Sequence, residues 1–456
     1  MSPPYTRRVL SPRRNAVRCV VIASLAVVAP MLGAAQQAQA AEKAIWGPVT
    51  LSDGRSAFPL YRELGVDTLQ LILNWRDVAQ VRPGDATDPA DPAYAWPQEI
   101  ATAIAEGDRH GVRIALRVYD TPGWANGGGP AMRTPDDPGD YADFLTAATR
   151  RYPAVRRWMI WTEPNRNDRF LPNNADGRDG PRAYARLLDR AYVALKAGNP
   201  RNIVIGGNTW TSGTVKPPDF LRFMRLPDGR TPRLDWFGHN PFPFRFPSLR
   251  GAPLAGGFRD ISDLDTLSGE VRAAYGRRVP LWLSEYTIQS NIGSNIFATF
   301  VSRPDQARYL TAGYAIGDEL GASVAGMGWL ALLDEAPAPG AAHWGLLTYA
   351  LERKPAFAAM ARAPSERLRP AVGVARAVTR SSVRRGRLAV AVTPKASGAI
   401  TVELRAGAVV RARVRATGTA GRRRTLRLRG AIRRGRYTLR VRSARAASVT
   451  RTIIVR

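Results

Sequence analysis

Two glutamates follow apolar runs that have the composition of buried strands. Glu163 comes directly after WMIWT (158–162), and Glu285 comes directly after PLWLS (280–284). An acid at the end of a buried strand is either a solvated loop residue or a reactive group at the edge of the core. Two such carboxylates could divide a hydrolysis between them. One donates a proton to a leaving oxygen, while the other, ionised, attacks or stabilises the cationic centre.

The elements that must position these acids are eight short apolar runs. Most of them are followed by an amphipathic helical pattern, which predicts a (β/α)8 TIM barrel. The runs span 44–49, 68–73, 112–118, 157–161, 202–207, 234–239, 280–285 and 324–332, and the clearest helices span 98–110, 139–151, 181–197, 261–275 and 304–320. The main alternative is an open doubly wound sheet, but the segment after the first run, WGPVTLSDG, is no Gly-rich phosphate loop.

In such a barrel the active groups lie at the C-terminal ends of the strands. Glu163 ends the fourth run and Glu285 ends the seventh, so both should project from one rim on nearly opposite sides of the barrel mouth. Burial and mutual repulsion would raise the pKa of one carboxyl and leave the other low. This arrangement predicts hydrolysis of a glycosidic bond.

Other residues at the same rim have types that suit a sugar site. Aromatic faces stack on sugar rings, and amide or imidazole groups bond hydroxyls. The candidates are Trp75, Trp124, Trp161, Trp329, Trp344, Asn74, Asn165, His239 and Asn240. Each has a structural alternative: a tryptophan in an apolar run is more often core, as we expect for Trp158 and Trp282, and a strand-end histidine is equally often a satisfied buried one.

The rim also carries cations. Arg117 and Arg166 would suit a uronic acid, although Arg117 is equally compatible with an inward position paired with an acid. The sequence contains no HExxH motif, paired histidine cluster or set of cysteine ligands, so we expect neither a metal nor another cofactor.

The N-terminal residues have the pattern of an export signal. Five arginines precede the apolar segment 19–32, and Ala38-Gln39-Ala40 is a small-x-small cleavage site. The apolar segment is too short to span a bilayer, and an uncleaved anchor is the alternative. Cys19, the sole cysteine, lies in this segment, so the mature chain would hold no disulfide. We expect a signal peptide over 1–40 and a secreted protein, and association with the cell wall is a further expectation.

The C-terminal part changes from continuous apolar runs to strict alternation of apolar and Arg positions. Residues 363–371 have the composition of a linker, and 372–456 predict a small antiparallel β-sandwich after the barrel domain of 41–362. Residues 371–456 hold 23 Lys and Arg against one acid, Glu403, whereas 42–370 are almost balanced. The net charge of +30 therefore describes the tail and is no argument for nucleic-acid binding by the barrel.

Three motifs together resemble a known group of enzymes. WTEPN (161–165), GHNPF (238–242) and WLSEYT (282–287) look like the fourth-, sixth- and seventh-strand segments of the retaining (β/α)8 glycoside hydrolases of clan A. DTPGWAN (120–126) is similar to the third-strand segment of family 39, and family 5 is the other near family. The resemblance covers roughly 41–360 and excludes the tail.

This resemblance implies roles for matching residues. Glu163 would be the acid/base and Glu285 the nucleophile of a double displacement. Trp329 would form the floor of a sugar-binding subsite, and His239 would match the sixth-strand histidine. The two carboxyl groups would lie about 5–5.5 Å apart.

Two positions depart from the clan pattern. Thr162 stands where an asparagine is usual, and Pro241 stands where a tyrosine often touches the nucleophile; Tyr286 or Tyr119 could replace that tyrosine. The departures leave open a barrel that binds polysaccharide without cleaving it. A second alternative is a surface protein that acts through the Arg-rich tail on an anionic wall polymer.

Overall fold

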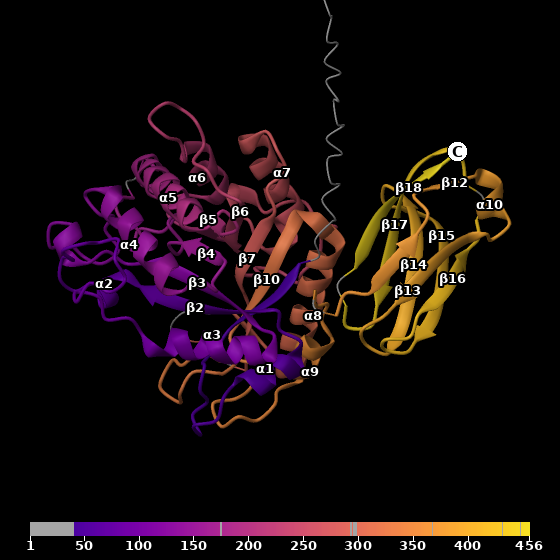
Figure 1. Cartoon of the computed structure of the whole chain (residues 1–456), viewed down its shortest axis with the longest axis horizontal. Coiled ribbons are helices and arrows are strands. Elements are labelled where there is room, and N and C mark those ends of the chain that lie inside the picture. The colour runs from indigo at the N-terminus through magenta and orange to yellow at the C-terminus, as the bar shows by residue number, and fades with distance from the viewer. Residues whose placement is uncertain are drawn as a thin grey trace, which may run out of the picture. The chain divides into compact units, whose positions relative to one another are not determined.

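The computed structural model describes residues 41–173, 176–291, 294, 299–366, 368–430, 432–446 and 448–456 (Figure 1). The export signal expected over 1–40 lies outside these residues. Among the described helices, none combines the length and the apolar character that crossing a membrane requires.

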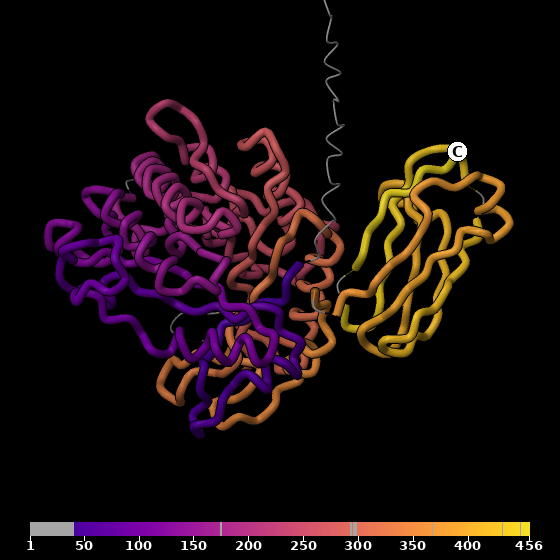
Figure 2. Tube along the Cα trace, viewed as in Figure 1, coloured from indigo at the N-terminus to yellow at the C-terminus, as the bar shows by residue number. Residues whose placement is uncertain are grey.

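Eight parallel strands close into a barrel in the order β1-β10-β7-β6-β5-β4-β3-β2. They are β1 (Glu42–Trp46), β2 (Thr68–Asn74), β3 (Arg113–Tyr119), β4 (Arg157–Ile160), β5 (Ile203–Trp210), β6 (Trp236–Asn240), β7 (Leu281–Tyr286) and β10 (Val324–Leu330). Pairing of β1 with β10 closes the ring, so the indigo start and the orange end of the barrel lie side by side (Figure 2). The predicted (β/α)8 barrel is confirmed, and the open doubly wound sheet is excluded.

Helices cover the outside of this ring. They are α1 (Phe58–Leu64), α2 (Trp75–Val78), α3 (Gln98–His110), α4 (Pro138–Arg151), α5 (Asp179–Gly198), α6 (Pro217–Phe223), α7 (Leu264–Tyr275), α8 (Arg303–Leu320) and α9 (Pro355–Arg362). All five helices expected from the sequence are present. Short one-turn helices and the two-residue strands β8 (Gln289–Ser290) and β9 (Phe300–Val301) add detail at the loops.

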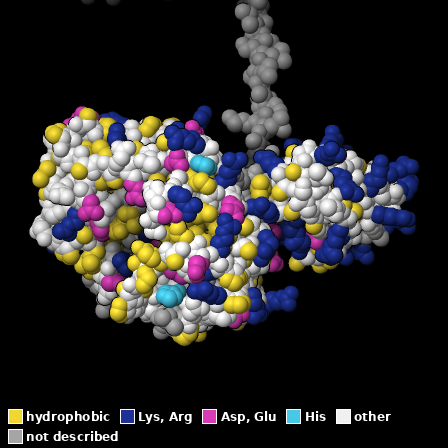
Figure 3. Space-filling model, turned by 90° about the horizontal axis from the view of Figure 1, so that it is seen from below, with side chains coloured by type: hydrophobic (Ala, Val, Ile, Leu, Met, Phe, Trp, Pro, Cys, Tyr) yellow, Lys and Arg dark blue, Asp and Glu magenta, His cyan; other side chains and the backbone are white. Residues whose placement is uncertain are grey.

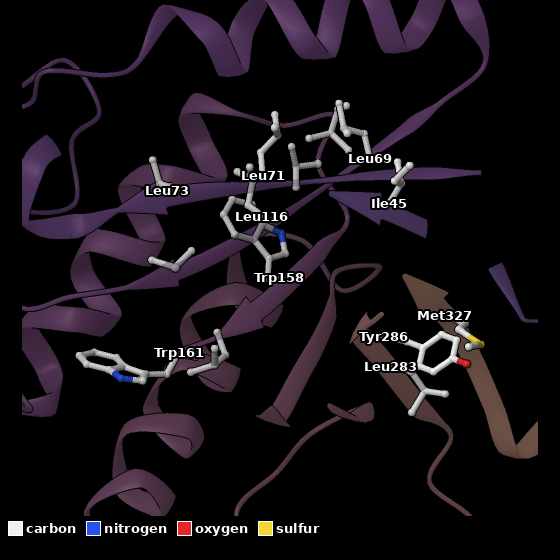
Figure 4. Close-up of a cluster of buried hydrophobic side chains, with 14 of the residues drawn as sticks. Ile45, Leu69, Leu71, Leu73, Leu116, Trp158, Trp161, Leu283, Tyr286 and Met327 are labelled. Carbon is white, nitrogen blue, oxygen red and sulfur yellow. The ribbon is translucent and has the colours of Figure 1, made fainter. Parts of the chain in front are cut away.

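Alternation along the strands separates two apolar layers. Ile45, Leu69 and Leu116 belong to the large core between the strands and the helices, where Figure 4 shows them with Trp158. Ala44, Trp46 and their counterparts on other strands fill the inside of the barrel as a smaller second core. Both faces of every strand are therefore covered, which is why the sequence shows continuous apolar runs.

The first strand lies earlier than the apolar pattern indicated. β1 begins at Glu42 and ends at Trp46, whereas the pattern favoured 44–49. Pro48 has no backbone N–H and cannot continue a ladder, so the strand stops before it. Glu42 and Lys43 are fully buried despite their charges. A search for apolar runs passes over charged residues, so it did not assign these two to the strand.

The C-terminal domain consists of two β-sheets around one core. Its elements are β11 (Ala371–Val374), β12 (Ala377–Val378), α10 (Arg380–Arg384), β13 (Leu388–Thr393), β14 (Gly398–Ala406), β15 (Val409–Gly418), β16 (Arg424–Leu428), β17 (Gly435–Ser443) and β18 (Val449–Val455). One sheet has the order β11-β13-β16 and the other β12-β18-β17-β14-β15. The predicted β-sandwich is confirmed. Its pairing is antiparallel except for β12, which the sequence pattern missed and which runs parallel to β18.

A buried ion pair ties the N-terminal ends of four barrel strands together. The Glu42 carboxylate accepts hydrogen bonds from Arg157 (Nη2 to Oε1, 2.5 Å) and from the Thr68 hydroxyl (2.6 Å), and Arg113 lies 3.3 Å away. Burial would raise the pKa of Glu42, but Arg157 and Arg113 together outweigh it and lower that pKa below its ordinary value. Glu42 therefore stays ionised in the folded chain.

Replacing Glu42 with Gln should lower the free energy of unfolding of the barrel by about 3–5 kcal/mol, because Arg157 would keep a buried charge without its partner. Since the folded-state pKa of Glu42 is depressed, its contribution is present above its ordinary pKa of 4.5 and is lost as pH falls through the depressed value. Denaturant unfolding at pH 7 and at pH 3 would measure both effects.

The matched control is Glu63→Gln, which removes an exposed ion pair with Arg353 and should cost less than about 1 kcal/mol. Equal losses for the two variants at pH 7 would contradict the role assigned to Glu42.

Candidate active site

The chain turns sharply between the end of β4 and Glu163. Trp161 and Glu163 have positive φ angles of 66° and 42°, which non-glycine residues rarely adopt. The turn is held from both sides: the Trp161 N–H donates to the Val118 carbonyl (2.8 Å), and the Glu163 N–H donates to the Asn208 carbonyl (3.0 Å). These bonds offset the strain of the turn and fix the direction of the Glu163 side chain.

The Asn208 carbonyl is available because β5 contains a bulge. Two residues of β5, Gly207 and Asn208, stand opposite one residue of β6, Gly238, and they have φ angles of 91° and 45°. The Asn208 side chain also donates to the carbonyl of Ile160 (2.9 Å). A β-bulge re-aims the local chain, and here it supports the loop that carries Glu163.

A second bulge aims Glu285. Leu283 pairs with Met327 and Tyr286 pairs with Trp329, so two residues of β7, Ser284 and Glu285, stand opposite one residue of β10. Leu283 and Tyr286 lie three positions apart, so in a regular strand they would point to opposite faces. Both nevertheless belong to the core outside the barrel wall. The extra residue lets Glu285 leave the face it would share with Leu283 in a regular strand.

Two side chains inside the barrel stabilise this bulge. The Ser284 carbonyl accepts a hydrogen bond from Trp46 Nε1 (2.8 Å) and another from Gln70 Nε2 (2.9 Å). Gln70 is itself held, because Trp282 Nε1 donates to its Oε1 (3.0 Å). The inner layer therefore binds the backbone beside Glu285 directly.

Glu285 is paired with an arginine from the opposite part of the barrel. Arg117 on β3 donates from Nη1 to Glu285 Oε1, and each side chain is 11% exposed. The Arg117 guanidinium lies 4.2 Å from the ring centroid of Trp46, which fixes its plane by a cation–π contact. Arg117 thus takes the inward position paired with an acid that the sequence left open. The pairing orients the Glu285 carboxylate.

Glu163 is held by a different pair of donors. Asn240 Nδ2 donates to Glu163 Oε1 (2.9 Å), and Arg166 Nη1 donates to Oε2 (2.8 Å). Asn240 also accepts from the hydroxyl of Ser284 (2.5 Å), the residue before Glu285. One amide therefore links the segments that carry the two carboxylates.

The electrostatics distinguish the two acids. Burial raises the pKa of Glu163, and the negative charge of Glu285 raises it further, above its ordinary value of 4.5. Arg166 and the hydrogen bond from Asn240 act in the opposite direction without cancelling the rise. A carboxyl with a raised pKa beside an ionised partner suits the pair for acid and nucleophile roles.

Four of the predicted binding residues have no surface to offer a ligand in this structure. Trp75 and Trp329 are fully buried, and Trp329 packs on Tyr286 outside the barrel wall. Asn165 is fully buried and bonds backbone groups of Trp210 and Val215. These contacts are structural, as the alternatives in the sequence allowed.

The fourth is His239, which is fully buried on the outer face of β6. Its Nδ1 bonds the Thr209 hydroxyl and its Nε2 bonds the Arg259 carbonyl, both at 2.8 Å. Burial lowers the pKa of His239 to about 4, so it is neutral at physiological pH. Asn240, the next residue, points inward to Glu163 instead.

Of the other three candidates, Asn74 and Trp124 lie nearer the surface. Asn74 caps α2 and donates to Asp120 (3.0 Å), and Trp124 is partly buried beneath the guanidinium of Arg82 at 4.4 Å. Thr162 is buried directly before Glu163. Their contact with a sugar stays a prediction. Of the tyrosines considered for the position of Pro241, Tyr286 is fully buried and donates to the Tyr309 carbonyl (2.6 Å), away from Glu285.

The residues that touch the acids were only partly foreseen. Asn240, Arg117 and Arg166 have candidate types at the rim, but nothing in the sequence showed which faces of their strands point inward. Ser284 and Gln70 carried no signal. Within the described part of the chain, no group of three or more His, Cys, Asp or Glu side chains could hold a metal ion.

Comparison with known proteins supports the architecture. No protein-family model matches the sequence, and no curated protein matches it. Among solved structures, a family 39 glycoside hydrolase from Bacteroides cellulosilyticus WH2 is 15% identical, with 91% of this chain and 80% of that chain covered and a TM-score of 0.53.

Two further structures agree. The family 39 enzyme from Xanthomonas axonopodis pv. citri is 16% identical over 86% of this chain and 92% of that one, with a TM-score of 0.50. A monomeric β-xylosidase from Caulobacter crescentus CB15 is 15% identical over 86% and 94%, with a TM-score of 0.51. At such identities the likeness concerns the fold, and it confirms the fold that the sequence motifs implied.

The raised pKa of Glu163 gives a test of the coupling between the acids. In Glu285→Gln the Glu163 carboxyl should titrate at lower pH, because a negative neighbour is removed. In Arg166→Gln it should titrate at higher pH, because a positive neighbour is removed. Carboxyl-selective NMR titration of the protein would measure both shifts. Shifts of the same sign in the two variants would show that the carboxyl is not governed by these charges.

Proposed function

We propose that the protein is a retaining glycosidase that hydrolyses O-glycosidic bonds of a poly- or oligosaccharide by double displacement. The observation that carries this proposal is the pair of buried carboxyls, Glu163 with a raised pKa and Glu285 paired with Arg117. The fold shared with family 39 glycoside hydrolases and a β-xylosidase supports it.

In the first step, Glu285 attacks the anomeric carbon while Glu163 protonates the departing oxygen, and a glycosyl-enzyme forms. In the second step, Glu163 takes a proton from water, which displaces Glu285 from the sugar. Asn240 suits both steps, because its amide can orient Glu163 whether that carboxyl is protonated or ionised. No step requires a metal.

Arg117 makes a contact with Glu285 like the one that the clan pattern gives to a tyrosine. An arginine orients Glu285 through a charge-assisted bond rather than through a phenol hydroxyl. Such a contact would let the chain tolerate Pro241.

A second candidate function is binding without cleavage. The ion pair between Arg166 and Glu163 favours it, because a proton donor held ionised by an arginine would not serve as an acid. Thr162 and Pro241 point the same way. The net rise in the pKa of Glu163 argues for the catalytic function.

We further propose that the protein is exported and cleaved after residue 40. Outside the cell, the basic C-terminal domain would associate with an anionic wall polymer. The export pattern in 1–40 and the one-signed charge of 371–456 support this location.

Turnover of aryl β-glycosides and of plant and microbial polysaccharides is the direct test. Glu163→Gln should lower kcat by roughly 10²–10⁴, with the smallest loss for aryl leaving groups that need no proton. Glu285→Gln should lose activity on every substrate. Glu352→Gln, an exposed acid, is the control and should keep wild-type rates.

The products give an independent test of the mechanism. NMR of the newly formed sugar should show the same anomeric configuration as the substrate. Inverted product would contradict double displacement. Absence of turnover with polysaccharide binding retained in both glutamine variants would favour the non-catalytic function.

Arg117→Met should lower kcat about 100-fold, the scale of losing the orientation of one reacting group. Arg117→Lys should restore part of the rate, because a cation beside Glu285 is kept. An unchanged kcat in Arg117→Met would contradict the role assigned to the contact.

A further inference from the structure

The surface of the C-terminal domain carries charge of one sign. Glu403 is the sole acid among residues 371–456, and it is 1% exposed. Arg413 Nε donates to its Oε1 (2.8 Å), Arg405 donates to its Oε2 (3.1 Å), and Arg442 lies 3.3 Å from Oε1. The one acid is thus enclosed by three arginines, so the domain presents no acidic side chain of its own to solvent.

Several of the exposed arginines lie together on one edge of the domain. β15 is the outermost strand of the five-stranded sheet, and β16 is the outermost strand of the three-stranded sheet. A single turn joins them, and Arg424 of β16 donates to the Thr417 carbonyl of β15. Besides Arg413, which pairs with Glu403, the exposed arginines of this β15–β16 edge are Arg411, Arg415, Arg422, Arg423, Arg424 and Arg427.

Neighbouring charges do not neutralise this edge. Among the described residues, the ion pairs of the C-terminal domain involve Glu403 and, through Arg440, Asp318 on α8. Neither acid pairs with the six arginines of the edge. Figure 3 shows the dark blue of Lys and Arg spread over the visible face of this domain. Such a density of like charge disfavours the compact state unless an anion binds.

Protection of an exposed strand edge is a simpler explanation for some of this charge. Charged side chains on edge strands prevent pairing with other chains. Positive charges, negative charges or a mixture of both would serve that purpose equally well, however. It does not account for the enclosure of the only acid or for the arginines of the turn at 422–424.

The chemistry of the edge defines the partner. Arg411 and Arg415 lie four positions apart on β15, which separates them by roughly 13 Å, and Arg427 lies on the neighbouring edge strand β16. Cations spaced along an edge suit a linear chain with recurring anionic groups, because each guanidinium can bind a carboxylate or sulfate with two hydrogen bonds. The one aromatic residue of the domain, Tyr437, is buried, so no ring is available for stacking with nucleic-acid bases.

We propose that the β15–β16 edge binds an acidic polysaccharide, a linear glycan with a carboxylate or sulfate on each repeat. This inference deepens the association proposed above for the basic domain, and binding at this edge does not depend on turnover in the barrel. The edge would hold the barrel near a charged glycan, either the substrate itself or the matrix around it.

The test measures binding of the full protein to polygalacturonate and dextran sulfate, with neutral dextran as the uncharged probe. The edge variant is Arg411→Gln with Arg415→Gln and Arg427→Gln. It should weaken binding roughly tenfold at low salt, about twofold for each lost contact, and it should flatten the dependence of the affinity on salt. Glu285→Gln should bind as the wild type does, which separates this inference from the proposed catalysis.

A charge-matched control removes three exposed arginines that lie outside β15, β16 and the turn between them, Arg376, Arg436 and Arg456, each replaced by Gln. Its affinity should fall less than twofold, and thermal melts should confirm that both triple variants fold. Equal weakening by the two triples, or no binding to either acidic glycan at low salt, would overturn the proposal. Tighter binding to double-stranded DNA or inorganic polyphosphate than to both glycans would assign the edge to a different partner.

Discussion

The repulsion between two buried carboxylates is the constraint on which the barrel mouth depends. Glu163 and Glu285 act on each other strongly enough for the charge of one to raise the pKa of the other. Two like charges are tolerable in a buried site only if each has its own donors or one takes a proton. Glu285 has Arg117 as its donor, whereas Glu163 has Arg166 and Asn240. Because the two sets of donors differ, the two carboxyls differ chemically.

Backbone irregularity delivers the two acids to the same place. A regular strand would leave Glu285 on the face of Leu283, toward the helices, and the bulge in β7 turns it inward. A bulge also frees a carbonyl from the ladder, and Trp46 and Gln70 bond that of Ser284. The inner layer of the barrel is therefore a support for the site as well as a packed core.

One physical rule recurs at three levels of the molecule. Glu42 at the base of the barrel, Glu285 at its mouth and Glu403 in the β-sandwich are buried acids, and each has arginine partners. At the base the pairing stabilises the fold, and at the mouth it orients the Glu285 carboxylate. In the β-sandwich it removes the only negative charge from the surface, so that a domain of ordinary fold acquires a wholly cationic exterior.

The sequence by itself determined the order of elements, the barrel, the following β-sandwich and the strands that end on Glu163 and Glu285. These features depend on local composition, because continuous apolar runs and helical spacing can be recognised without knowing which residues are in contact. It could not determine the start of β1 at Glu42, since a charged residue in a strand looks like a loop until its partner Arg157 is known.

Only the tertiary structure decided which rim residues face the acids. When both faces of a strand are apolar, alternation does not say which positions point inward. The sequence therefore favoured His239 over Asn240, and the fold placed His239 outside and Asn240 inside. The bulge that turns Glu285 is held by Gln70 and Trp46, which lie 214 and 238 positions from Ser284 in the chain. Hydrogen bonds across such separations leave no local pattern, because they exist only once the barrel has closed.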